Sequence, residues 1–276
     1  MSEEIFPIVL NQNNYVNENT FTYKFPRGSV HFKNASVSLS QINIYYSWGN
    51  IEEQYNNNKF DIIFPDATPA TFTRYNVEVP YGNYTVEDLN QYLQHWSIQN
   101  NKYIVNASTG QNVYYMEFIS NPQTYKIEFI AHDIPTALPA GYLNPAGMTF
   151  SAVVSKPTLV ILPTNNFGEL IGYAPGAYFT SSSTRTPEMN PVSSVLVTCS
   201  LINNRFTSPN NVLYSFVSGS AQYGSMLAIQ NQDMVFTNIA EGYYKEVTIR
   251  FFSDKNKELY IKDRSLIIIL FVKIQK

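Results

Sequence analysis

The chain has 276 residues, a net charge of −3 and only 14% charged residues, with 21 tyrosines, 18 phenylalanines and one cysteine. This balance gives no electrostatic footprint for nucleic acid or an anionic membrane, and one cysteine excludes an internal disulfide framework. The many aromatic residues favour β-structure, and a β-rich chain of this length can form one domain with long loops.

The N-terminal segment, "MSEEIFPIVLNQNN", lacks the basic start and long apolar run of a signal peptide, so we expect a protein that is not secreted. Residues 1–20 contain three glutamates and no basic residue, which argues against electrostatic binding of nucleic acid. They also offer little apolar surface to offset the entropy of ordering. We therefore predict a flexible N-terminal arm over residues 1–20 and a single domain over residues 21–276.

The first clear strand signal is "ASVSLSQINIYYSW". Val37 and Leu39 lie in one phase of the alternation, whereas Ile42 and Ile44 lie in the other. Because a one-residue shift moves side chains to the opposite face of a sheet, this pattern predicts a β-bulge or a strand break near Ser40.

One helix is well signalled, in "YTVEDLNQYLQHW". Thr85 can cap it with Asp88 three residues on, and an apolar stripe follows at helical spacing: Leu89, Tyr92, Leu93 and Trp96. We expect this stripe to pack against a sheet. Residues 80–150 also contain a hairpin pattern and proline-rich loops. This combination predicts an insertion in the domain at about residues 80–150.

The stretch "NNFGELIGYAPGAYF" places Gly168, Gly172 and Gly176 at four-residue spacing. It matches neither a phosphate loop nor a dinucleotide loop, and Pro175 interrupts any continuous helix. We interpret it as a conformationally demanding connection without a ligand.

Later strands alternate more regularly. "SSVLVTCSL" and "KEVTIRFF" have period two and predict half-buried antiparallel strands. Further strands are predicted at residues 112–119, 124–131, 158–162, 212–217 and 225–229. The run Leu266–Val272 is apolar on both faces, which is typical of a central strand covered on both sides, and its seven residues are too few for a membrane span.

Residues that could carry chemistry are sparse. His31, His95 and His132 have no metal-ligand spacing, and Cys199 lies within strand periodicity as a small core residue. No nucleophile-elbow motif occurs, and Glu87 with Asp88 suits the first turn of a helix. We therefore predict no enzyme and no catalytic, cofactor-binding or metal residues.

Adjacent tyrosines are the remaining lead. One member of Tyr45/Tyr46 and one of Tyr114/Tyr115 should point away from the core, because neighbours on a strand face opposite sides. An outward tyrosine can anchor an interface, or it can lie flat under a loop. Taken together, the patterns predict an all-β antiparallel β-sandwich, a single jelly roll with one short helix and long loops or an insertion.

Several segments in unchanged order carry a resemblance: "NIYYSWGNI", "PYGNYTVEDLNQYL", "NVYYMEF", "NNFGELIGYAPGAYF" and "NPVSSVLVTCSLINNRFTSPNNVLYSF". From about residue 40 to the C-terminus the chain resembles the penton proteins of virophages and Maverick/Polinton elements. The resemblance implies a homopentamer at the five-fold vertices of an icosahedral double-stranded DNA virus or virophage particle, beside a larger double-jelly-roll capsid protein. It implies a virion location, synthesis inside the host cell and no catalytic or metal residues.

Three alternatives stay open. The chain could be a shell protein of the same lineage. It could be a carbohydrate- or receptor-binding jelly-roll module that uses Trp48 or Trp96 as a platform. It could also be a β-sandwich hydrolase without a recognisable signature.

Overall fold

The computed structural model describes residues 3–65 and 71–275 of the chain. The chain divides into two compact units, which are described separately. Unit 1 comprises Met1–Trp48 and Val192–Lys276, and unit 2 comprises Gly49–Pro191. Each unit has its own hydrophobic core.

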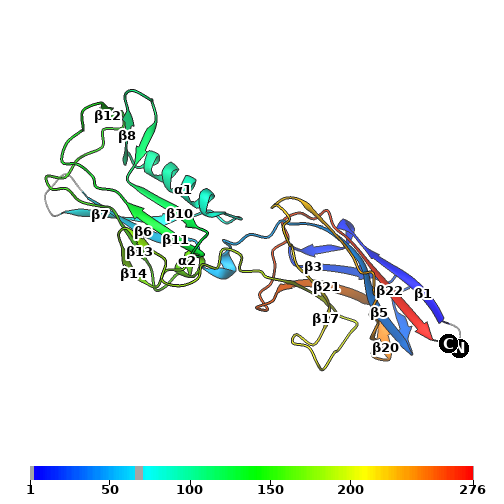
Figure 1. The fold of residues 1–276 in the computed structure, drawn as a ribbon. Coiled ribbons are helices and arrows are strands. Elements are labelled where there is room, and N and C mark those ends of the chain that lie inside the picture. Colours follow the sequence, from blue (N-terminus) through cyan, green and yellow to red (C-terminus); the bar gives the residue numbers. More distant parts are fainter. Residues whose placement is uncertain (1–2, 66–70, 276) are drawn as a thin grey trace. The chain divides into compact units, whose positions relative to one another are not determined.

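Unit 1 contains two main antiparallel sheets (Figure 1). The first has the order β1 (Glu3–Leu10), β22 (Ile267–Gln275), β5 (Ala35–Tyr45) and β18 (Met226–Gln230), with β19 (Thr237–Asn238) also paired to β5. The second has the order β17 (Val212–Phe216), β16 (Val195–Cys199), β21 (Glu246–Ser253), β3 (Thr20–Lys24) and β2 (Tyr15–Asn17). A small third sheet pairs β4 (Val30–Phe32) with β20 (Gly242–Tyr244), and a short 3-10 turn, η1 (Gln12–Asn14), follows β1.

The strand order of unit 1 is that of a jelly roll. Its eight principal strands in chain order are β1, β3, β5, β16, β17, β18, β21 and β22. The first sheet holds the first, eighth, third and sixth of them, and the second sheet holds the second, seventh, fourth and fifth. The predicted fold class, an antiparallel β-sandwich with a single jelly roll, is therefore confirmed.

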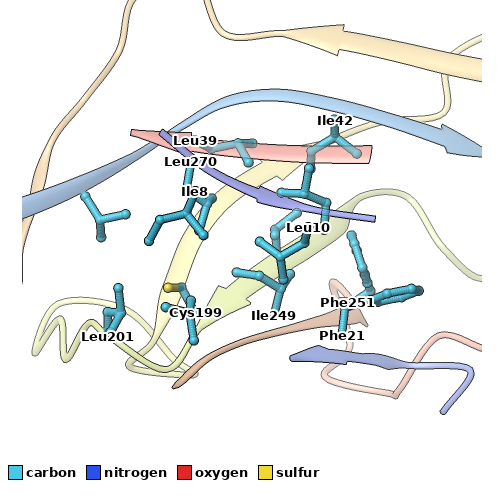
Figure 2. Packing of buried hydrophobic residues seen from close by; sticks show 14 of the residues in the cluster. Ile8, Leu10, Phe21, Leu39, Ile42, Cys199, Leu201, Ile249, Phe251 and Leu270 are labelled. Carbon is cyan, nitrogen blue, oxygen red and sulfur yellow. The ribbon is translucent and has the colours of Figure 1, made fainter. Parts of the chain in front are cut away.

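Inward-facing side chains of the two sheets form the core of unit 1 (Figure 2). Leu10, Leu39 and Leu270 from the first sheet meet Phe21 and Ile249 from the second, and all five are at most 1% exposed. The bulge predicted near Ser40 is confirmed, because the register against β22 shifts between Leu39 and Gln41. The bulge lets apolar residues on both sides of it reach the same core.

The N-terminal segment differs from the flexible arm expected over residues 1–20. β1 pairs with β22 along its whole length, from Glu3 opposite Gln275 to Leu10 opposite Ile268. The reason is packing: Ile8 and Leu10 are buried in the core, so this short apolar run supplies a complete edge strand. Met1 and Ser2 lie outside the described residues.

The last strand, β22, is central as predicted, but only one of its faces is covered within unit 1. Ile268, Leu270 and Val272 are buried on the inner face. On the outer face Ile267 is 43% exposed, and Ile269 and Phe271 are half-buried. The unbroken apolar sequence of β22 therefore does not mean that both faces of the strand are fully buried within unit 1.

Unit 2 interrupts the jelly roll between β5 and β16 and is larger than the insertion expected at residues 80–150. One sheet has the order β14 (Gly176–Tyr178), β13 (Thr158–Ile161), β6 (Lys59–Pro65) and β7 (Phe72–Glu78). Another joins β10 (Met116–Asn121), β11 (Lys126–Ala131) and β15 (Ser181–Ser182), and a third joins β12 (Tyr142–Leu143), β8 (Tyr103–Asn106) and β9 (Asn112–Tyr114). A 3-10 turn, η2 (Glu53–Tyr55), precedes β6. Strands β6 and β13, which lie outside residues 80–150, belong to unit 2 because Phe60, Ile62 and Leu159 pack in its core.

Two α-helices occur in the described part of unit 2, α1 (Val86–Gln99) and the short α2 (Phe167–Ile171). The predicted cap of α1 is confirmed: Thr85 Oγ1 accepts from Asp88 N at 3.1 Å, and Asp88 Oδ2 accepts from Thr85 N at 2.9 Å. Leu89, Leu93 and Trp96 face the core of unit 2, as the apolar stripe predicts. The strands predicted at residues 112–119, 124–131, 158–162, 212–217 and 225–229 correspond to β9 with β10, β11, β13, β17 and β18.

Candidate functional site

The glycine-rich stretch is a packed connection between β13 and β14. Gly172 ends α2 in the left-handed conformation, with φ at 80°. A Cβ atom on Gly168 would lie 2.4 Å from the carbonyl oxygen of Tyr173 and 2.5 Å from Ile161 Cγ2. The glycines therefore serve close backbone packing and chain reversal, in agreement with the prediction of a conformationally demanding connection.

Asparagines fix the start of this connection. Asn165 Oδ1 accepts from the backbone N–H groups of Lys59 and Phe167, at 3.1 and 3.0 Å. Asn166 donates from Nδ2 to the carbonyl oxygen of Tyr55 at 2.9 Å. These bonds tie α2 to the loop before β6, so the polar residues of the motif also have a structural role.

The three histidines lie at separate places. His31 Nε2 is 4.0 Å from Glu241, His132 Nε2 is 2.8 Å from Glu117, and His95 contacts Gln99 at 2.8 Å. Within residues 3–65 and 71–275, no group of three or more His, Cys, Asp or Glu side chains is arranged to hold a metal ion.

Cys199 lies in the core of unit 1, where burial raises the pKa of its thiol to about 12. A thiol with this pKa is protonated at neutral pH and is a poor nucleophile. The position of Cys199 agrees with its interpretation as a small core residue.

The aromatic residues proposed as a glycan platform are not available for it. Trp48 is 2% exposed and Trp96 is 7% exposed, so neither presents a face to solvent. Trp48, three residues after the end of β5, packs in the core of unit 1, and Trp96, the last residue of the apolar stripe of α1, packs in the core of unit 2. The version of the carbohydrate-binding alternative that relies on these two residues is therefore wrong.

The paired tyrosines give one clear inward member. Tyr115 is buried, whereas Tyr114 is half-buried on β9 beside Tyr103, with ring centroids 6.5 Å apart. Tyr45 and Tyr46 are both half-buried, and the ring of Tyr46 lies 4.7 Å from that of Trp48. Neither pair presents a fully exposed ring.

An apolar strip covers the outer face of β1 and β22 in unit 1. We define this outer strip by six residues that alternate with the core residues of these strands: Ile5, Pro7, Val9, Ile267, Ile269 and Phe271. Direct cross-strand pairs join Pro7 to Phe271 and Val9 to Ile269. Ile5, Val9 and Ile267 are between 43% and 52% exposed. Sequence alternation alone could not locate the strip, because it depends on the pairing of the two ends of the chain.

A second group of exposed apolar side chains lies in the connections between the principal strands of unit 1, which include the short strand β20. Phe206 between β16 and β17 is 98% exposed, and Val235 and Tyr243 between β18 and β21 are 74% and 78% exposed. Ile202 pairs with Ile239 and Tyr243 pairs with His31, so the loops between β3 and β5, between β16 and β17, and between β18 and β21 adjoin one another. We call Phe206, Val235 and Tyr243 the loop residues.

The edge of the sheet beside the outer strip is modified by Pro7. Proline has no backbone N–H group. It is tolerated on an edge strand, where the position of the missing N–H group can point away from the neighbouring strand. Its presence in the middle of β1 weakens this edge as a template for another strand. Contacts at the outer strip are therefore expected to use side chains on the face of the sheet.

No protein-family model and no curated protein matches the chain. Among solved structures, the chain is similar to the crystal structure of the selenomethionine-labelled mavirus penton protein. The identity is 10% and the TM-score is 0.43, and the match covers 99% of this chain and 98% of the mavirus chain. In the described part of the chain, no helix is both long and apolar enough to cross a membrane.

Proposed function

We propose that the chain is a structural capsid protein that forms the pentameric vertex of an icosahedral double-stranded DNA virus or virophage particle. The sequence motifs that resemble penton proteins motivate the vertex assignment. Several of these motifs have structural roles in unit 2: "PYGNYTVEDLNQYL" caps α1, and "NNFGELIGYAPGAYF" forms the connection through α2.

The observation that carries the proposal is the outer strip. Six apolar residues, four of them in two direct cross-strand pairs, occupy one face of the sheet and are half-buried or exposed in the single chain. Contiguous exposed apolar surface on a soluble protein marks an interaction site, because burying it removes it from water. A protein whose role is assembly needs such a surface, and copies arranged in a closed ring bury it in every subunit.

A second assembly contact is assigned to the loop residues. Phe206 and Tyr243 are large, exposed and apolar or amphipathic, which are the properties of interface anchors. We assign them to the contact with the larger double-jelly-roll capsid protein. The proposed location is the virion, after synthesis inside the host cell.

The proposed role requires no chemistry. The only cysteine is protonated and buried, and the histidines lie apart from one another. The acidic residues Glu3 and Glu4 form part of β1, and Glu3 Oε2 forms an ion pair with Lys273 Nζ at 2.7 Å. We therefore propose no enzymatic activity and no direct binding of nucleic acid.

The test is the oligomeric state. Mass photometry of the purified chain, alone and with its capsid partner, is expected to give a species of five subunits. Val9→Lys and Ile267→Lys place charge on the outer strip at exposed positions, so each is expected to abolish the ring while the monomer keeps its thermal midpoint.

Gln91→Lys is the matched control, because Gln91 is exposed on α1 in unit 2. It is expected to leave the ring intact. A stable trimer would instead identify a shell protein of the same lineage, and a monomer under all conditions would exclude the vertex role.

A further inference from the structure

A pocket of about 370 Å³ opens on unit 2, and all the residues that line it belong to that unit. Its walls are the segment that leads into α1, the hairpin between β10 and β11, and the segment that returns toward unit 1. These walls comprise residues 83–87, 120–122, 125–127, 187 and 189–190.

Tyr125 on the wall of this pocket has an unfavourable backbone conformation. It is the last loop residue of the hairpin, with φ at 52°, and it is 69% exposed. The other non-glycine residues with positive φ in the described chain are all asparagines. Asparagine tolerates the left-handed conformation, whereas a bulky aromatic residue rarely adopts it. Asn or Gly at this position would adopt the backbone conformation with less strain. The presence of a tyrosine therefore indicates a role for its side chain other than in folding.

The polar groups around Tyr125 are available to a ligand. The side chains of Asn83, Ser120 and Asn190 make no hydrogen bond to any described residue. Asn121 and Thr85, by contrast, are used within the protein, by Glu128 and Thr124 and by the cap of α1. The pocket thus offers amide groups that both donate and accept, plus a hydroxyl group.

Charge and backbone contacts argue against two other classes of ligand, ionic compounds and peptides that add a strand. The pocket contains one acidic side chain, Glu87, and one basic side chain, Lys126, so it has no excess charge for an ionic ligand. A peptide that adds a strand requires free N–H groups on a sheet edge. On β10 the N–H of Phe118 already donates to Asn90 Oδ1 at 3.0 Å.

We infer that this pocket binds a neutral saccharide. A sugar ring has an apolar face of C–H groups, which packs on the ring of Tyr125, and a rim of hydroxyl groups, which both donate and accept hydrogen bonds. Asn83, Ser120 and Asn190 pair with that rim, and Pro122, Pro187 and Met189 supply the apolar wall. This site is independent of the proposed capsid role, because it lies within one subunit.

The test uses saturation-transfer NMR on the full chain, with the methyl glycosides of glucose, galactose, mannose and N-acetylglucosamine as probes. At least one glycoside is expected to receive saturation on its ring protons. Tyr125→Asn is expected to weaken that binding at least tenfold while the thermal midpoint stays equal or rises, because Asn suits the left-handed conformation.

Tyr243→Asn is the matched control, since Tyr243 is also highly exposed, at 78% against 69% for Tyr125, but lies in unit 1. It is expected to leave glycoside binding unchanged. Absence of saturation for all four glycosides overturns the inference. A site that binds peptides instead would give this same result. Binding that survives Tyr125→Asn overturns it too. Neither result bears on the ring of five subunits.

Discussion

The side-chain nitrogen of Asn50 donates to the carbonyl oxygen of Met189 at 2.8 Å, which joins residues 139 positions apart. The same Nδ2 donates to the carbonyl oxygen of Tyr84 at 2.8 Å, and Oδ1 accepts from Tyr84 N at 2.9 Å. One buried amide thus holds together the first segment of unit 2, its last segment and the approach to α1. Asn57 supports it by donating to the carbonyl oxygen of Asn50 at 2.7 Å.

Asn50→Ala is expected to lower the stability of unit 2 by about 2–4 kcal/mol, because three hydrogen bonds are lost and their backbone partners stay buried. Hydrogen–deuterium exchange measured by mass spectrometry separates the peptides of unit 2 from those of unit 1. Faster exchange is expected near residues 50, 84 and 189. Asn112→Ala is the control, since Asn112 is exposed on β9. Equal protection in both variants would show that the three segments are held by packing alone.

Gly168→Ala tests the close approach in the glycine-rich stretch. The added methyl group would meet the Tyr173 carbonyl oxygen and Ile161 Cγ2 well inside contact distance, so a loss of about 1–3 kcal/mol is expected in urea unfolding. Gly242→Ala is the control. Its Cβ would lie 3.8 Å from Tyr244, and the expected change is within about 0.5 kcal/mol. A neutral Gly168→Ala would mean that α2 shifts freely relative to β13.

Much of the fold could be predicted because its signals are local. The cap and stripe of α1, the alternation of β16 and β21, and the bulge at Ser40 all depend on residues within one element. The N-terminal strand could not be predicted in this way, since β1 is ordered by β22 at the other end of the chain. The extent of unit 2 could not be predicted either. Alternation of apolar and polar residues shows that a strand is half-buried, but it does not show which of the two cores the strand packs against.

The candidate sites were less predictable than the fold. The outer strip requires knowledge of the register between β1 and β22. Trp48 was proposed as part of a glycan platform, but it is buried in a core formed by strands distant from it in the sequence. Tyr125 could not be located from the sequence, because it falls within the strand predicted at residues 124–131, whereas β11 begins at Lys126 and Tyr125 is the last residue of the hairpin loop.

Tyr115→Phe is expected to stabilise unit 2 by about 1 kcal/mol. The hydroxyl oxygen of Tyr115 is buried and has no hydrogen-bond partner among the described residues, so its removal relieves a desolvation cost. Urea unfolding at pH 7 measures the change. A loss of stability would show that an ordered water or another partner satisfies the hydroxyl group.

The same variant tests a pH effect. Burial and, to a smaller extent, the nearby Tyr142 together raise the pKa of Tyr115 from 10.0 to about 12. A group whose pKa is raised on folding contributes stability that is complete below its unfolded pKa and is lost as the pH rises through its folded pKa. Stability should therefore fall between pH 10 and pH 12, and less steeply in Tyr115→Phe. Identical slopes in both proteins would contradict the assignment.

Truncation after Arg264 is expected to give insoluble protein, because it removes β22 from the middle of the first sheet. Burial of a large apolar side chain is worth about 1.5–3 kcal/mol, so Ile268, Leu270 and Val272 together contribute on the order of 5–9 kcal/mol. That is comparable to the net stability of a typical domain. The truncation also exposes the ladder edges of β1 and β5, which can then pair with other chains.

Point variants separate the two faces of β22 without removing the strand. Leu270→Ala, on the inner face, is expected to cost about 2–5 kcal/mol in urea unfolding. Ile267→Ala, at an exposed position of the outer strip, is expected to cost less than about 1 kcal/mol in the monomer and to weaken assembly. Removal of Gln275 and Lys276 is expected to be harmless, since Gln275 is exposed at the end of the strand and Lys276 lies outside the described residues. If the chain that ends at Arg264 were soluble and melted cooperatively, the jelly roll would not depend on β22 within its own subunit, and this strand would instead belong to a contact between subunits.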